Sequence, residues 1–139
     1  MNDQLVEIRS YEGPGYRPLV DFQTWRVAVL RFSDDLRPEK LTRLQRHAET
    51  DEVFVLLEGR CILFIGEGEP VRRVHALDMQ PYKIYNVHQG VWHTHTLSQN
   101  ANVLIVENFD TTLENSPFTD LTPDQQAEIA AETHRLWDL

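Results

Sequence analysis

The sequence predicts an all-β barrel or jelly roll followed by one C-terminal helix. Short runs rich in β-branched and aromatic residues recur about every ten residues, with turn formers between them. A clear helical signature stands only near the end of the chain. The 139 residues show no internal repeat and no linker-like shift in composition, so we expect one domain over residues 1–139, with its core barrel over about residues 20–110.

The composition is that of an ordinary globular domain, with 41% apolar and 25% charged residues. The formal net charge of −9 repels phosphate backbones and anionic lipids, so we expect neither nucleic acid nor membrane as a partner. The longest apolar stretch, near Val53 to Leu57, is too short to span a bilayer. The N-terminus, Met1 to Gln4, lacks the features of a signal peptide, and we therefore expect a cytoplasmic protein.

The first third of the chain predicts two strands and a long connection. Leu5 to Arg9 is a candidate edge strand, and the Gly- and Pro-rich stretch Glu12 to Gly15 predicts a loop after it. Phe22 to Phe32 is dense in β formers and predicts one long strand. Ser33 to Arg46 is polar and predicts a connection with some extended structure.

The middle of the chain carries the densest strand signal. Glu52 to Leu57 and Arg60 to Ile65 are apolar runs joined at Gly59, and a glycine supplies the positive φ of a tight hairpin turn, so we expect these runs to form a hairpin. Cys61 lies in the second run and is expected to be a small buried hydrophobe. Further strands are expected at Val71 to Ala76, Lys83 to Val87, Val91 to Leu97 and Asn102 to Glu107.

The C-terminal segment predicts a helix over about residues 123–138. Thr122 suits the N-cap, Pro123 suits the first helical position, and Gln125 completes a capping box. One apolar stripe then runs along the helix through Ile129, Thr133, Leu136 and Trp137. We expect this helix to pack on the outside of a sheet; a helix that binds a partner or a second copy is the alternative.

One spacing points to chemistry: His47, four residues, Glu52, six residues, Gly59. Side chains alternate along a strand, so Glu52, Phe54 and Leu56 would share the inward face of a barrel. Glu52 is therefore expected at the barrel mouth, close to the approach that carries His47. Taken singly, a glutamate is usually solvated and a histidine is usually a satisfied polar group, and those readings stay open.

The segment from Gln45 to Gly59 resembles the first motif of the cupin superfamily. That motif has two histidines one residue apart, then three or four residues, a glutamate, six residues and a glycine. His47, Glu52 and Gly59 match it, whereas Gln45 stands where the family has its first histidine. A glutamine offers only a neutral amide oxygen, which is a weaker metal ligand than imidazole.

The segment from His88 to His93 is similar to the second cupin motif at Gly90 and His93. It departs from that motif where His88 replaces a proline, Leu97 an asparagine and Tyr82 an early glycine. The resemblance covers roughly residues 45–97 and implies a double-stranded β-helix, the cupin barrel.

The resemblance also implies a metal site made of His47, Glu52 and His93. Two histidines and a carboxylate form a facial triad that suits iron, manganese, nickel or zinc, with Gln45 or a water at a fourth position. His95 lies two residues after His93 and faces the same way on a strand, so it is either a further ligand or an acid/base group. Tyr85 is a second candidate for moving a proton.

A shorter resemblance involves Gln89 to His93, which looks like a segment of the ureidoglycolate lyases. Trp92 points away from His93 on a strand, so it is expected to pack in a core or an interface. Tyr82 and Lys83, with Tyr85, are either lining residues of the pocket or exposed strand residues.

Two function classes follow. The first is a metal-dependent enzyme, such as a lyase or isomerase, that acts on a sugar, hydroxy acid or ureide. The second is a non-catalytic binding module or sensor that uses the same pocket without a metal. In either case we expect a small-molecule ligand and a homodimer, because an edge strand such as Leu5 to Arg9 needs a partner or a cover.

Overall fold

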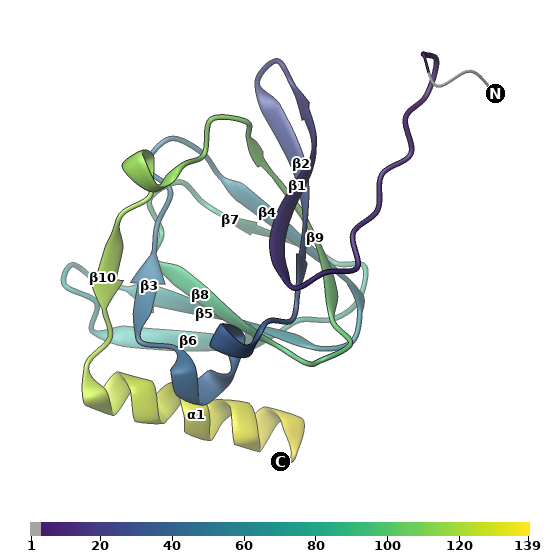
Figure 1. Cartoon of the computed structure of the whole chain (residues 1–139). Coiled ribbons are helices and arrows are strands. Elements are labelled where there is room, and N and C mark those ends of the chain that lie inside the picture. The colour runs from purple at the N-terminus through teal and green to yellow at the C-terminus, as the bar shows by residue number, and fades with distance from the viewer. Residues whose placement is uncertain (1–3) are drawn as a thin grey trace.

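Two antiparallel five-stranded sheets face each other, and one helix lies along the outer side of the second sheet (Figure 1). The structure is a computed structural model, which describes residues 4–139. Residues 1–3, part of the N-terminal segment from which we expect no signal peptide, lie outside the described residues. The predicted all-β jelly roll with a C-terminal helix is confirmed.

The first sheet contains, in spatial order, β1 (Gly15–Phe22), β2 (Trp25–Arg31), β9 (Asn102–Asn108), β4 (Glu52–Glu58) and β7 (Ile84–Val87). The second contains β10 (Phe118–Asp120), β3 (Arg43–Gln45), β8 (His93–Leu97), β5 (Cys61–Glu67) and β6 (Arg73–Asp78). Three short 3-10 turns are η1 (Asp34–Leu36), η2 (Pro38–Lys40) and η3 (Leu113–Asn115), and the helix is α1 (Pro123–Trp137). The spacing of β-forming residues does not clearly predict the short strands β3 and β10.

The strand predicted at Leu5 to Arg9 is wrong. That segment is irregular and projects from the barrel (Figure 1), with Ile8 85% exposed. It lacks the neighbouring strand that its backbone groups would need for pairing. The first strand is instead β1, which begins at Gly15 inside the predicted loop and pairs with β2. The long strand predicted over Phe22 to Phe32 corresponds to β2, and a turn at Gln23, whose φ is 50°, separates it from its predicted first residue, which ends β1.

The hairpin predicted around Gly59 is also wrong in its pairing. Strand β4 pairs with β7 and β9, whereas β5 pairs with β6 and β8 in the other sheet. Gly59 has the expected positive φ, 71°, and a Cβ there would lie 2.7 Å from Ala101 Cα. The glycine therefore makes a tight turn as predicted, but the turn carries the chain from one sheet to the other.

Two hydrophobic cores lie on the two sides of the second sheet. The interior core fills the barrel and includes Cys61, which is fully buried as predicted. The outer core lies between the second sheet and α1 and is formed by Leu41, Leu44, Ile62, Phe64, Trp92, Leu121 and Ile129. The helix therefore packs on the outside of the sheet, as expected.

The start of α1 has the predicted capping box. Thr122 accepts a hydrogen bond from the Gln125 backbone N–H at 3.1 Å, and Gln125 Oε1 accepts one from the Thr122 N–H at 3.0 Å. These bonds satisfy two of the donors that a helix start leaves free.

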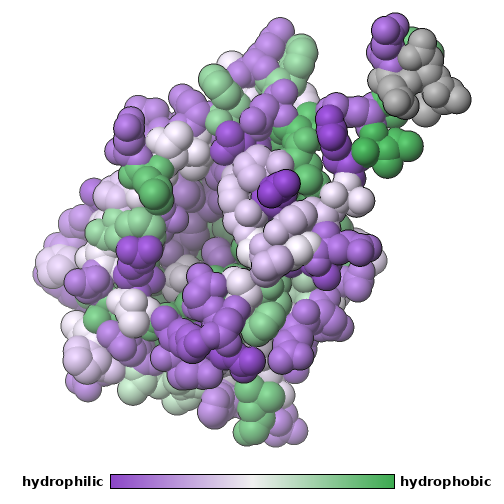
Figure 2. Space-filling model, viewed as in Figure 1, coloured by the Kyte–Doolittle hydropathy of each residue, from purple (hydrophilic) through white to green (hydrophobic). Residues whose placement is uncertain are grey.

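The surface seen in Figure 2 is mostly hydrophilic, with scattered apolar groups, some of them on the projecting N-terminal segment. Leu5 is 76% exposed on that segment. None of the helices in residues 4–139 has the length and hydropathy of a membrane span.

Candidate metal centre

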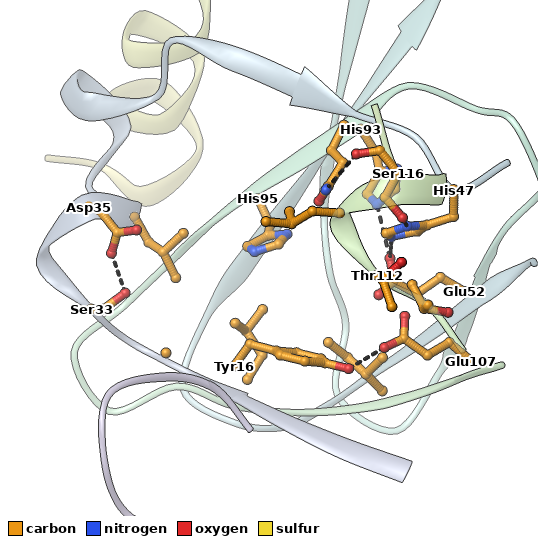
Figure 3. A pocket seen from close by; sticks show the side chains of 17 residues that line it. Tyr16, Ser33, Asp35, His47, Glu52, His93, His95, Glu107, Thr112 and Ser116 are labelled. Atoms are coloured by element: carbon orange, nitrogen blue, oxygen red, sulfur yellow. Dashed lines mark hydrogen bonds and ion pairs between the residues drawn. The ribbon is translucent and has the colours of Figure 1, made fainter. Parts of the chain in front are cut away.

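The three residues predicted to bind a metal meet at one point inside the barrel. His47 follows β3, Glu52 begins β4 and His93 begins β8, and all three side chains are buried. His47 Nε2 and His93 Nε2 each lie 2.9 Å from the same Glu52 oxygen, Oε1. One ligand atom from each residue falls within 4.8 Å of the others. Figure 3 shows these side chains at one end of a pocket.

Contacts between two loops hold His47 beside the start of β8. Gly90 has a φ of 80°, and its N–H donates to the His47 carbonyl at 2.9 Å. The Asp51 carboxylate accepts hydrogen bonds from the Gln89 N–H at 2.7 Å and from Asn86 at 3.0 Å. The Asn86 amide and then the Gln89 N–H lower the pKa of Asp51, so this carboxylate stays an acceptor. The two cupin-like motifs are thus joined directly.

A second connection lies on the outer surface of the second sheet. The Arg46 guanidinium lies over the Trp92 ring, 4.3 Å from its centroid, and contacts Glu69 at 3.1 Å. Trp92 Nε1 donates to the other Glu69 oxygen at 2.9 Å. We call Arg46, Glu69 and Trp92 the outer clamp. Because Arg46 precedes His47 and Trp92 precedes His93, the clamp fixes the spacing of the two histidines from outside.

The hydrogen bonds of His93 leave its metal-facing nitrogen without a proton in the neutral ring. Nδ1 lies 3.0 Å from the Val91 carbonyl oxygen, which only accepts, so Nδ1 is the protonated nitrogen. Nε2 then points a lone pair at the Glu52 carboxylate. Two acceptors at this distance repel each other unless a cation lies between them, either a proton on the ring or a metal ion. The donor set therefore fits a divalent ion.

Hydrogen-bond contacts at both ring nitrogens also orient the His47 side chain. Its Nδ1 lies 2.7 Å from Ser116 Oγ, while Nε2 faces Glu52. Burial raises the pKa of Glu52, but hydrogen bonds donated by His47 and His93 when their rings carry the proton that a metal ion would replace outweigh that effect and hold the pKa well below its usual range. The carboxylate is therefore ionised and offers the negative charge that a metal site needs.

Gln45 lies beside the triad, but its amide is engaged elsewhere. Its Nε2 donates to the Ser116 carbonyl at 3.0 Å, and its backbone pairs with His93 between β3 and β8. The role of Gln45 as a fourth ligand stays a prediction.

His95 lines the same pocket as His93. Within residues 4–139, its buried Nδ1 has no hydrogen-bond partner. Burial, followed by the charge of His93, lowers the pKa of His95 to about 4, so the ring is neutral. A neutral imidazole with an unpaired nitrogen is suited to bind a ligand or to accept a proton.

The pocket has a volume of about 440 Å³ and extends from the triad to the wall formed by β1 and β9. On that wall, Tyr16 Oη donates to the Glu107 carboxylate (Figure 3). Burial, followed by the charge of Glu52, raises the pKa of Glu107 to about 7. Leu30, Leu36 and Ile105 form an apolar part of the lining.

Sequence reasoning missed Glu107 and Tyr16. Glu107 follows Val103 and Ile105 at alternate positions of a predicted strand, so alternation alone places it on the inward face. Tyr16 had no such signal, because it lies between the predicted loop, Glu12 to Gly15, and the strand predicted from Phe22, in a stretch for which no strand was predicted.

The structure does not bring Tyr85 to this pocket. Its hydroxyl accepts a hydrogen bond from the Gln80 N–H at 2.9 Å, and its ring packs against the interior core. Lys83 and Tyr82 are exposed, and Tyr82, which stands where the family has a glycine, has a φ of 64°. The tyrosine of the pocket is Tyr16. Trp92 points away from His93 into the outer core, as predicted.

Comparisons with known proteins support the fold. No family model and no curated protein matches the sequence. Among solved structures, Streptomyces Pac13, described as a nucleoside dehydratase, matches with a TM-score of 0.56 at 7% identity, over 85% of this chain and 88% of that one. A protein from Planctomyces limnophilus matches with 0.54 at 12% identity, over 81% and 90%. The Fe(II) form of HppE matches with 0.52 at 20% identity, over 68% of this chain and 50% of that one.

Proposed function

Because the chain has a cupin fold with two histidines and a glutamate converging in its pocket, we propose that it is a metal-dependent enzyme acting on a small polar metabolite. The observation that carries the proposal is that His47 Nε2 and His93 Nε2 each lie 2.9 Å from the same oxygen of the buried Glu52 carboxylate. The reaction class that suits the pocket is elimination or isomerisation, in which a proton is taken from or returned to carbon or oxygen. The solved structure of HppE, a protein of similar fold, contains Fe(II).

The residues of the pocket have separate roles in this proposal. His47, Glu52 and His93 would hold the ion, which supplies Lewis acidity toward a substrate carbonyl or hydroxyl. His95, neutral and unpaired at Nδ1, accepts the proton. On the opposite wall, Tyr16 and Glu107 bind a polar group of the substrate. The apolar lining excludes water from the reacting atoms.

One observation favours the alternative, a non-catalytic binding module without metal. Gln45 stands where the cupin motif has its first histidine, and its amide Nε2 donates to the Ser116 carbonyl at 3.0 Å. A pocket of this kind would bind its ligand through hydrogen bonds alone.

Metal analysis tests the proposal. We expect protein purified without chelator or affinity tag to contain about one iron, manganese, nickel or zinc ion per chain. After chelation, the correct ion should restore thermal stability. The variant His93→Ala should lose the ion, whereas His134→Ala, at an exposed position of α1, should keep it. Less than about a tenth of an equivalent, with no stabilisation by any of the four ions, contradicts the proposal. Unchanged ligand binding by His93→Ala would support the non-catalytic module.

Two further expectations are carried forward as proposals. We infer a homodimer, because Leu5, Val6 and Ile8 are exposed on the projecting segment and would gain from burial against a second copy. Light scattering that gives the mass of one chain contradicts it. We also infer a cytoplasmic location, which fractionation of cells tests.

A further inference from the structure

The segment before β1 carries apolar side chains that its own chain leaves uncovered. We call residues 4–10 the arm; all of them are exposed, and the arm projects from the barrel (Figure 1). Leu5, Val6 and Ile8 are 76%, 49% and 85% exposed. In a strand, alternation would put Val6 and Ile8 on one face and Glu7 on the other. The arm therefore has the alternation of a strand, although it belongs to no sheet in the part of the chain that the structure describes.

Contacts at its base fix the point where the arm leaves the barrel. Tyr11 Oη donates to the Pro14 carbonyl at 2.6 Å, and the Arg17 guanidinium lies 5.3 Å from the centroid of the Tyr11 ring. From this point the arm runs away from β6 and α1 of its own chain (Figure 1). Its apolar side chains are thus offered to a second molecule.

A groove of about 390 Å³ lies between β6 and α1. Its apolar part is formed by Phe64, Val74, Ala76 and Ile129. Side chains from both faces of β6 line it, so the groove follows the edge of that strand. Strand β6 is the last of the second sheet, and among residues 4–139 no strand lies beside this edge. A free edge presents backbone N–H and C=O groups with which an added strand can pair.

The apolar faces of the arm and the groove match. Val74 and Ala76 pack on the outer core, so they face α1. A strand added at the edge of β6 continues this face when Val6 and Ile8 point toward α1. Two side chains that now lie in water would then be buried against the apolar part of the groove.

The charges on the other face match as well. Arg73 alternates with the residues that face α1, so it lies on the opposite face of β6, where it is exposed. Glu7, between the two apolar residues of the arm, would lie on that same face. Its present partner is Arg9 at 3.2 Å, in an exposed pair that stabilises little and is easily exchanged. Glu128 and Glu132, on the α1 side of the groove, would lie on the face away from Glu7.

We propose that the arm of one copy adds as a strand to the free edge of β6 in a second copy, and that two copies exchange arms about a two-fold axis. Such an exchange is closed, because each copy gives one arm and fills one groove, so no further copy is recruited. The inference rests on the homodimer proposed above and deepens it by naming the interface.

A matched pair of isoleucine variants of the full chain tests this interface. Ile8→Asp puts a charge into the apolar groove and should weaken the dimer about a hundredfold or more. Ile84→Asp changes an isoleucine that is 73% exposed on β7, at an edge of the first sheet, and should leave the dimer intact. Light scattering over a dilution series measures both dissociation constants. An intact dimer in Ile8→Asp, or an equal loss in the control, overturns the proposal.

A charge exchange tests the position of the arm on β6. Glu7→Arg and Arg73→Glu should each weaken the dimer about tenfold, because like charges then meet across the interface. The double variant restores opposite charges at the wild-type net charge and should recover most of the affinity. A double variant as weak as the two single changes predict together overturns the pairing with β6.

The outcomes separate this interface from the other proposals. A monomeric wild type refutes the homodimer and the arm exchange together, whereas a dimer that survives Ile8→Asp refutes only the arm exchange. Metal content is measured on the same samples and tests the proposed enzyme alone, because the groove borders α1 outside the second sheet and the triad lies inside the barrel.

Discussion

The two faces of the second sheet have different roles, although the same strands form both of them. On β8, His93 and His95 face the pocket, whereas Trp92, just before the strand, packs outward beneath α1. On β5, Leu63 belongs to the interior core and Phe64 to the outer core. The outer face packs an apolar core beneath α1, while part of the inner face lines the cavity that contains the triad. Neighbouring residues should therefore give separable effects, stability on one face and metal binding on the other.

The largest effect on stability is expected from the outer face. Phe64→Ala leaves a cavity beneath α1, where Phe64 is fully buried, and should lower the free energy of unfolding by about 3–5 kcal/mol. Urea denaturation measures this loss. Leu139→Ala, at an exposed terminal position, serves as the control and should change little. Metal content per folded chain should be unchanged; a folded variant that has lost its ion would break the separation of the two faces.

The next largest effect comes from the inner face and appears only with metal. At an ion concentration of about 100 times the dissociation constant, binding should stabilise the wild type by about 2.7 kcal/mol. His93→Ala should lose this increment, because one of the two ring nitrogens facing Glu52 is gone. Denaturation with and without the ion measures the difference. An increment that survives in the variant contradicts the assignment of His93 as a ligand.

A smaller effect should come from the support behind His47. Ser116→Ala removes the hydroxyl that lies 2.7 Å from His47 Nδ1 and so loosens the orientation of the ring. We expect metal affinity to fall by about tenfold, or about 1.4 kcal/mol, in a competition titration with a chelator. Ser98→Ala removes a hydroxyl that bonds to Arg60 and Asn100 instead, so it should leave metal affinity as it is. Equal affinities of the two variants would show that Ser116 does not orient the ring.

The smallest effect is expected at the start of α1. Thr122→Ala removes the N-cap oxygen and should cost about 1 kcal/mol of stability, measured by thermal unfolding. Thr122→Ser keeps the oxygen and should restore most of that loss. Neither variant should alter metal affinity, because the helix contacts only the outer face. A change in affinity would indicate that the two faces are coupled through the sheet.

The candidate site was more predictable than the strand pairing. Alternation, a local property of the chain, placed Glu52 inside, and the resemblance to the two cupin motifs implied that His47 and His93 lie beside it. The strand with which each strand pairs depends on segments that are distant in the sequence. Gly59 indicates a tight turn, but the sheet that the next strand joins depends on which of the flanking strands pairs with β7, β8 or β9.

The capping box around Thr122 was equally local, and the structure confirms it. Tyr16 shows the opposite case, since it reaches the pocket only because β1 pairs with β2, a contact that the loop-like residues around Gly15 do not suggest.

The outer clamp affects how the proposed metal site would bind an ion. Arg46 and Trp92 hold the two histidine-bearing segments together through contacts that need no metal. Little chain entropy is then lost when an ion arrives, in contrast to small zinc domains that fold only on binding. An ion bound at the proposed site would therefore be able to exchange for another while the barrel stays folded. Its identity would be governed by which ions the surroundings supply as much as by the ligands themselves.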